Sequence, residues 1–129
     1  MPGHADFLVD MAYDIGLTSA ADYQRFVHDQ VTSTLAAVDA GPPVAGFRLF
    51  LAVPAYPASR YHDPSVENVG VALAGATAAM TELDKAGAPS AGWFHGIATF
   101  LHTDGSGNDG YAGWSTDWAT IARAWLGSP

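Results

Sequence analysis

Two aspartates follow apolar segments that have the length and composition of buried strands. Asp14 comes directly after the segment 7–13, and Asp104 comes shortly after the segment 94–101. In parallel α/β sheets, ligands bind at the carboxyl ends of the strands, so both side chains are candidate catalytic groups. A pair of carboxyl groups about 5–10 Å apart is the arrangement that hydrolyses glycosidic bonds. The structural alternative is that Asp14 caps a turn before Gly16 and that Asp104 opens a glycine turn.

A second group of candidate residues lies in the predicted loop 55–63, which holds Tyr56, Arg60, Tyr61 and His62. Aromatic faces and a guanidinium fork suit the recognition of a sugar or of a carboxylate. A loop of this composition can also fold over itself, stiffened by its prolines, without any chemical role. We take Tyr56, Arg60 and His62 forward as candidate substrate-binding residues.

A third group lies in the glycine-rich segment that follows the last predicted strand, where His102 and Trp114 are further candidate substrate-binding residues. Trp114 would either stack on a sugar ring or staple the helix that follows it. The run from Asp104 to Gly110 has the D-x-S-x-N spacing of a calcium loop, but Asp109 stands where such a loop needs glycine. We therefore interpret the segment as a flexible active-site loop.

The remaining motifs argue against metal and cofactor chemistry. The chain has five histidines and no cysteine, so thiolate sites and cysteine nucleophiles are excluded. No H-E-x-x-H motif is present, and no third ligand stands near His102-Thr103-Asp104 or near His62-Asp63. Phosphate-binding, dinucleotide-binding and nucleophile-elbow motifs are also missing from the sequence. The sequence therefore predicts no metal site and no cofactor.

The composition restricts the partners of the chain. Hydrophobic residues make up 49% of the 129 residues, charged residues make up 14%, and the net charge is −8. This balance excludes global disorder, and the negative charge disfavours nucleic acid and anionic membranes as partners. No apolar run approaches the ~18 residues of a membrane span. The segment Met1–Asp10 lacks the features of a signal peptide, so a cytoplasmic location is the default expectation.

The candidate residues are positioned by alternating strands and helices. The apolar segment 7–13 predicts a strand, and an N-cap signature at Thr18-Ser19 with Asp22 in the first turn begins a helix over 20–39. One face of that helix carries apolar residues at spacings of three and four. They are Tyr23, Phe26, Val27, Val31, Leu35 and Val38. Asp6 and Asp10 share one face of the strand, where either would be a polar residue of a barrel interior or lie at the solvated strand end.

The pattern then repeats twice. A strand over 47–53 is followed by a helix from Pro64 to about Lys85, with Asp63 as its N-cap and Gly87 after its end. In that helix Ala74-Gly75 would allow close packing on a sheet. The third unit is a strand over 94–101, the glycine-rich loop 102–113, and a helix capped by Ser115 or Thr116.

The sequence thus predicts a single α/β domain over residues 1–129, with parallel strands in the order β-α-β-α-β-α. Consecutive crossovers of one hand place all helices on a single face of the sheet. The other face would then expose large apolar side chains, which is rare on a monomer. We expect a partner chain or further βα units to cover it, that is, a homo-oligomer or a missing part of a barrel.

Three segments, from Asp10 to Asp14, from Phe50 to Tyr56 and from Gly96 to Phe100, together resemble one known family. DMAYD resembles the M-x-Y-D signature that ends the sixth strand of the family-18 glycoside hydrolases, which are chitinase-like TIM barrels. FLAVPAY is similar to the "lgiPfYG" end of their seventh strand, and GIATF is similar to the "GvmiW" start of their eighth. The resemblance covers almost the whole chain but only about the last three-eighths of such a barrel.

This resemblance implies a partial (β/α)8 TIM-barrel-like fold and part of a sugar pocket. Tyr13 and Asp14 match the positions that hold the ring substituent of the substrate and polarise the reacting group, and Tyr56 matches a pocket wall. The family's D-x-x-D-x-D-x-E acid motif is absent, and the two glutamates, Glu67 and Glu82, fall in the second predicted helix. Phe100 stands at the position that is usually tryptophan in the family.

Two functions follow as expectations. The first is a carbohydrate-active, glycoside-hydrolase-like barrel segment that is catalytically incomplete alone, with Asp14 orienting the substrate, Tyr13 donating a hydrogen bond beside it, and Asp104 as the acid. The second is a non-catalytic, self-associating α/β module that binds a small polar ligand.

Overall fold

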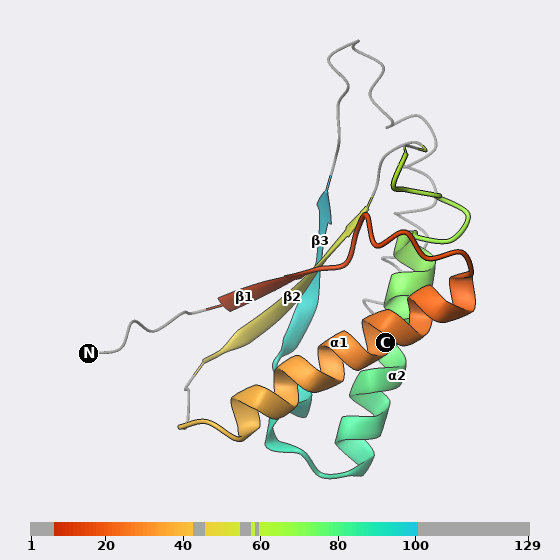
Figure 1. The fold of residues 1–129 in the computed structure, drawn as a ribbon. Coiled ribbons are helices and arrows are strands. Elements are labelled where there is room, and N and C mark those ends of the chain that lie inside the picture. The colour runs from red at the N-terminus through yellow and green to blue at the C-terminus, as the bar shows by residue number, and fades with distance from the viewer. Residues whose placement is uncertain (1–6, 43–45, 55–57, 59, 101–129) are drawn as a thin grey trace, which may run out of the picture.

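The computed structural model describes residues 7–42, 46–54, 58 and 60–100. Three strands and two α-helices alternate along this part of the chain, and a short 3-10 helix precedes the last strand (Figure 1). The elements are β1 (Phe7–Met11), α1 (Ala20–Asp39), β2 (Arg48–Pro54), α2 (Val69–Lys85), η1 (Pro89–Gly92) and β3 (Phe94–Phe100). None of the helices within these residues is long and apolar enough to cross a membrane. The glycine-rich loop and the last helix that the sequence predicts lie outside the described residues.

The three strands form a parallel sheet in the order β1-β2-β3, so neighbours in the sequence are neighbours in space. Leu8 pairs with Leu49, and Leu51 pairs with Asp10 on one side and with Ile97 on the other. The α/β class and the parallel arrangement predicted from the sequence are therefore confirmed for the described elements. The first strand is shorter than the apolar segment that predicted it, because the chain turns after Met11.

Helix α1 forms where the sequence signals place it. Ser19 is its N-cap, and the side-chain oxygen of Ser19 accepts a hydrogen bond of 3.1 Å from the backbone N–H of Asp22. That bond satisfies one of the helix's unpaired amide donors. The buried residues recur every fourth position along one stripe of the helix, as the apolar spacing predicted. They are Tyr23, Val27, Val31 and Leu35.

Helix α2 begins later than predicted. Asn68, not Asp63, is its N-cap, and the side chain of Asn68 accepts a 3.0 Å hydrogen bond from the N–H of Val71. Asp63 instead closes a separate turn, in which its carboxylate accepts a bond of 2.8 Å from the N–H of Ser65. The chain therefore makes one turn capped by Asp63, leaves helical geometry, and begins α2 after Asn68. The helix ends as predicted, because Gly87 adopts φ +68° in a Schellman motif.

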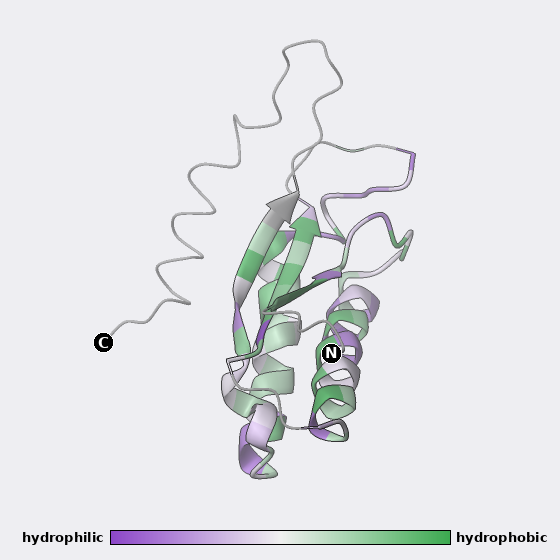
Figure 2. Ribbon diagram, turned by 90° about the vertical axis from the view of Figure 1, so that its left-hand side faces the viewer, coloured by the Kyte–Doolittle hydropathy of each residue, from purple (hydrophilic) through white to green (hydrophobic). Residues whose placement is uncertain are grey.

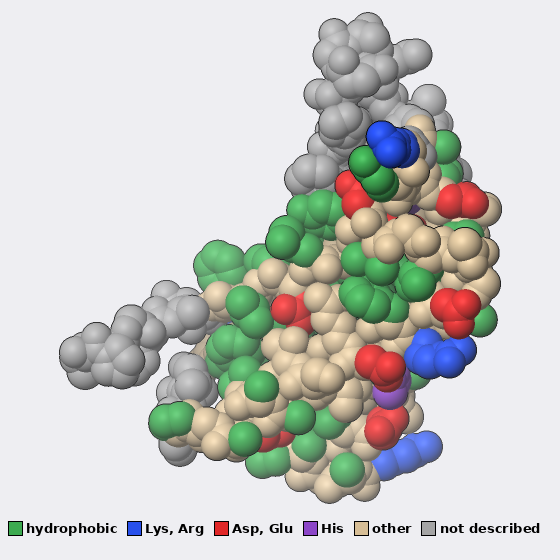
Figure 3. Space-filling view, viewed as in Figure 1, with side chains coloured by type: hydrophobic (Ala, Val, Ile, Leu, Met, Phe, Trp, Pro, Cys, Tyr) green, Lys and Arg blue, Asp and Glu red, His purple; other side chains and the backbone are tan. Residues whose placement is uncertain are grey.

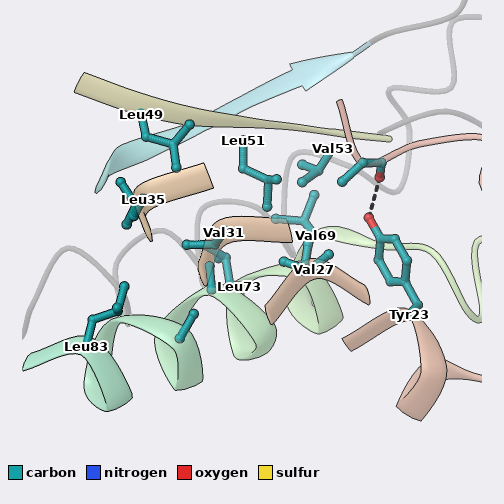
Figure 4. Close-up of a cluster of buried hydrophobic side chains, with 14 of the residues drawn as sticks. Tyr23, Val27, Val31, Leu35, Leu49, Leu51, Val53, Val69, Leu73 and Leu83 are labelled. Carbon is teal, nitrogen blue, oxygen red and sulfur yellow. Dashed lines mark hydrogen bonds between the residues drawn. The ribbon is translucent and has the colours of Figure 1, made fainter. Parts of the chain in front are cut away.

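Both helices cover the same face of the sheet, and the core lies between them and β2. Leu49, Leu51 and Val53 project from β2 towards the apolar stripes of α1 and α2 (Figure 4). The expectation that Ala74-Gly75 packs closely on the sheet was wrong, because Gly75 packs against α1. A Cβ at Gly75 would lie 2.4 Å from the backbone oxygen of Gln24.

The opposite face of the sheet is mainly apolar, and within the described residues no helix covers it. Phe7, Val9 and Met11 of β1 are 58%, 38% and 62% exposed. The ring of Phe7 meets that of Phe50 of β2 edge-on, with centroids 6.2 Å apart. The strands are mainly hydrophobic in Figure 2, and Figure 3 shows hydrophobic side chains gathered over β1, whereas most charged side chains lie over the helices. The bare apolar face that the crossovers predicted is thus present in this part of the chain.

Candidate functional site

The candidate site lies where the chain leaves the carboxyl ends of β1 and β2. The connection from β1 to α1 and the described part of the connection from β2 to α2 lie side by side at this end of the sheet (Figure 1). Ligands of parallel α/β proteins bind at this edge, because the loops that follow neighbouring strands converge there. The structure therefore brings parts of two predicted groups, the one around Asp14 and the one around His62, into the same region.

Tyr13 and Asp14 lie at the start of the first connection. The hydroxyl group of Tyr13 donates a hydrogen bond of 3.1 Å to the sulfur of Met11, which projects from the bare face of β1. Asp14 is exposed and adopts φ +55°, a left-handed conformation that aspartate tolerates better than most residues. Asp14 thus both shapes the turn before Gly16 and presents a carboxyl group at the surface.

The connection that holds Tyr13 and Asp14 is fixed by a carboxylate from the second connection. Oε1 of Glu67 accepts a hydrogen bond of 2.8 Å from the N–H of Gly16, and Oε2 accepts one of 3.4 Å from the N–H of Ile15. The Glu67 side chain is only 1% exposed. A buried carboxylate is tolerated when donors surround it, so these amides and this carboxylate stabilise one another.

His62 completes this buried cluster. Its Nδ1 lies 3.7 Å from Oε2 of Glu67, and the His62 side chain is also 1% exposed. The sequence suggested His62 as a substrate-binding residue, whereas the structure places it in the interior beside Glu67. Because it is buried, His62 supports the site from within and does not line its exposed surface.

Tyr23 of α1 holds the first connection from the helix side. Its hydroxyl group donates a 2.5 Å hydrogen bond to the backbone oxygen of Ala12 (Figure 4). Burial raises the pKa of Tyr23 well above its usual value, and the negative charge of Glu67 raises it further. The tyrosine therefore stays protonated and remains a donor throughout the physiological range.

Arg60 and Tyr61 lie at the surface of the second connection. The guanidinium carbon of Arg60 is 5.2 Å from the centroid of the Tyr61 ring, a cation–π distance, and both side chains are exposed. This contact presents a positive charge and an aromatic ring together. Both are suitable groups for a polar or sugar ligand.

The other predicted residues are placed as follows. Tyr56, His102, Asp104 and Trp114 lie outside the described residues, so the separation of the Asp14 and Asp104 carboxyl groups remains a prediction. Asp10 is on the helix face of β1, where Oδ2 accepts a 2.6 Å hydrogen bond from the hydroxyl of Thr34. Asp10 is therefore part-buried and paired on the helix face of β1, whereas Asp6 lies outside the described residues. Among the described residues, no three histidine, aspartate or glutamate side chains gather closely enough to hold a metal ion.

Glu67 is the residue that sequence reasoning missed. The sequence placed it inside a helix that was expected to begin at Pro64, where it had no assigned role. The available signal was weak: a carboxylate stands between two apolar positions, Val66 and Val69, where the second connection meets α2.

No protein-family model matches this chain, and searches of curated proteins and of solved structures find no significant match.

Proposed function

We propose that this chain is a carbohydrate-binding, glycoside-hydrolase-like segment of a β/α barrel, with its ligand site at the carboxyl ends of the strands. The order of the strands supports a barrel. In a doubly wound sheet the strand order reverses and helices cover both faces. Here the order is β1-β2-β3 and both α-helices lie on one face, which is the progression of a (β/α)8 barrel.

The bare face of the sheet fits the interior of such a barrel. Barrel interiors are packed with side chains from alternate positions of every strand. The large side chains of Val9, Met11 and Phe50 stand on this face, and Gly96 of β3, the partner of Phe50, shares it. Further βα units would bury these residues, so the segment is proposed to be catalytically incomplete alone.

The placement of Tyr13 and Asp14 is the observation that carries the carbohydrate assignment. Both follow the carboxyl end of β1, and Tyr13 bonds to Met11 on the proposed interior face. The neighbouring connection offers Arg60 and Tyr61 at the surface. A carboxylate, a phenol, a guanidinium and an aromatic face are the groups with which proteins hold hydroxyl-rich rings. Asp104 remains the proposed acid.

The test is oligosaccharide binding, followed by nuclear magnetic resonance with chitotetraose and cellotetraose as probes. We expect binding by the native chain, a loss of about tenfold or more for Asp14→Asn, and no change for Asp84→Asn, which removes the same charge from an exposed position on α2. A native chain that binds neither probe would refute the proposal. Because the segment is proposed to be catalytically incomplete alone, we expect the native chain to hydrolyse aryl glycosides at the background rate only, and a rate above background would contradict that part of the proposal.

The exposed apolar face supports a second candidate, a self-associating module. The face carries Phe7, Val9 and Met11, and within the described residues the outer edge of β1 pairs with no other strand. A second copy of the chain would cover this surface without additional βα units. A native monomer, shown by light scattering, would refute the self-associating module, whereas a native chain that binds neither sugar probe would refute carbohydrate binding.

A further inference from the structure

We propose that Glu67 is a positioning residue, whose buried carboxylate holds the connection after β1 in the shape that presents Tyr13 and Asp14 to a ligand. This inference rests on the proposed function, because it concerns the same site. It assigns a role to a residue that contacts no ligand itself and acts through the backbone of the neighbouring connection.

The two hydrogen bonds of Glu67 act directly on the residues after Asp14. The N–H of Ile15 belongs to the peptide unit that joins Asp14 to Ile15, and the N–H of Gly16 belongs to the next unit. Holding both amides on one carboxylate fixes the orientation of two successive peptide planes. The left-handed φ of +55° at Asp14 is a sparsely populated conformation, which persists only where its surroundings hold it.

A second anchor lies on the N-terminal side of Tyr13 and Asp14. The backbone of Ala12 donates a 2.9 Å hydrogen bond to the oxygen of Ala52 in β2, and its own oxygen accepts the hydroxyl of Tyr23. Tyr13 and Asp14 therefore stand between an anchor at Ala12 and an anchor at Ile15 and Gly16. Only two residues of backbone lie between the two anchors. Both anchors therefore determine the position of the carboxyl group of Asp14.

Burial makes the Glu67 anchor stiff. Its side chain is 1% exposed, so water does not compete with the two amides for the carboxylate oxygens. A buried carboxylate deprived of its donors is costly, and the connection is held in place by that penalty. An exposed carboxylate at the same distance would exchange its partners with water and would fix the backbone far less.

The same residue belongs to the second connection. The N–H of Glu67 donates a 2.8 Å hydrogen bond to the backbone oxygen of Asp63, and the Glu67 carboxylate lies 3.7 Å from Nδ1 of His62. His62 and Asp63 directly follow Arg60 and Tyr61 in the sequence. Glu67 therefore joins the two connections that carry the exposed candidate ligand groups.

The test compares Glu67→Gln with Glu82→Gln, the same substitution at the other glutamate of the chain. Glutamine keeps one oxygen acceptor but turns an amide NH2 towards the second backbone donor. We expect Glu67→Gln to bind chitotetraose or cellotetraose about tenfold or more weakly, and to show changed amide resonances and faster hydrogen exchange at Ile15 and Gly16. Glu82 lies on the exposed surface near the other end of α2, so Glu82→Gln should leave both readouts unchanged.

Two outcomes separate the inference from the proposed function. If the native chain and folded Glu67→Gln bind the probe equally well, Glu67 is not a positioning residue, while the carbohydrate proposal stands. If the native chain binds neither probe, the proposed function fails, and the inferred role in ligand presentation fails with it. Unchanged exchange at Ile15 and Gly16 in Glu67→Gln would refute the anchor independently of any ligand.

A second variant covers the case in which Glu67→Gln does not fold. Tyr23→Phe removes only the hydroxyl group that holds Ala12 and keeps the buried ring. It loosens the same two residues from the other side, so we expect weaker probe binding here as well. Full affinity in folded Tyr23→Phe would contradict the two-anchor arrangement.

Discussion

The carboxylate of Glu67 accepts a 2.8 Å hydrogen bond from the backbone N–H of Gly16, which lies 51 residues earlier in the chain. This bond joins the connection after β1 to the connection after β2 at the carboxyl edge of the sheet. It makes the stability of the fold depend on a carboxylate whose side chain is only 1% exposed.

Replacing Glu67 by alanine should therefore destabilise the fold strongly. The substitution leaves the amides of Ile15 and Gly16 without their acceptor in a part-buried site and also opens a cavity. We expect a loss of about 2–4 kcal/mol in the free energy of unfolding, measured in urea. Glu82→Ala, at an exposed position, should cost at most about 1 kcal/mol. Equal losses for the two variants would contradict the structural role of Glu67.

Gly75→Ala should destabilise the pair of helices, although alanine is the better helix former. The added Cβ would lie 2.4 Å from the backbone oxygen of Gln24 and 3.0 Å from Cβ of Val27, so α1 and α2 must separate. Overpacking of this kind costs about 1–3 kcal/mol, which exceeds the gain of up to about 1 kcal/mol in helix propensity. The control is Gly92→Ala, where a Cβ meets nothing within 4 Å. Thermal unfolding of both variants distinguishes close packing from a general effect of the substitution.

The bridge between α1 and α2 at His28 should make stability depend on pH. Nδ1 of His28 lies 2.9 Å from Asp29 and Nε2 lies 2.8 Å from Glu82. Hydrogen bonds to Asp29 and then to Glu82 raise the pKa of His28 above its usual value. Because the folded pKa is raised, the bridge contributes fully below the unfolded pKa of about 6.5 and is lost as pH rises through the folded pKa.

The measurement is the difference in unfolding free energy between the native chain and His28→Gln, taken at about pH 5.5 and about pH 9. The native chain should be the more stable of the two at the lower pH, and the difference should shrink at the higher pH. Glu82→Gln removes one of the two carboxylates and should reduce this pH dependence. A difference that grows with pH would show that His28 is not stabilised as the cation.

The bare apolar face of the sheet should control the mass of the native protein in solution. Val9 stands on this face and is 38% exposed. If copies of the chain cover one another there, the native protein will have a mass greater than that of one chain, and Val9→Lys will shift it towards the monomer. Ala78→Lys adds the same charge to an exposed position on α2 and should leave the mass unchanged. A native monomer that binds no hydrophobic dye would argue against self-association.

Local signals in the sequence were enough to predict most elements. The N-cap at Ser19, the stripe from Tyr23 to Leu35 and the glycine after α2 each act over a few residues, so the sequence shows them directly. The parallel sheet also followed from the alternation of strands and helices, because strands joined through a helix pair in parallel. The bare apolar face then followed from the hand of the crossovers.

The predicted start of α2 was wrong because two possible capping residues, Asp63 and Asn68, lie within six positions of each other. Asp63 followed by Pro64 is the stronger local signal, yet the helix begins after Asn68. The turn closed by Asp63 brings Glu67 to the amides of Ile15 and Gly16, a contact that no local rule contains.

By itself, the sequence determined which faces of the strands and helices are apolar and where most of the helix ends fall, because both depend on residues close together in the chain. Tertiary structure alone decided what each face meets: α1 against Gly75, Thr34 against Asp10, and the amide of Gly16 against Glu67. Periodicity encodes the burial of a side chain, whereas the identity of its partner depends on how distant segments pack, and these partners lie 24 to 51 residues apart.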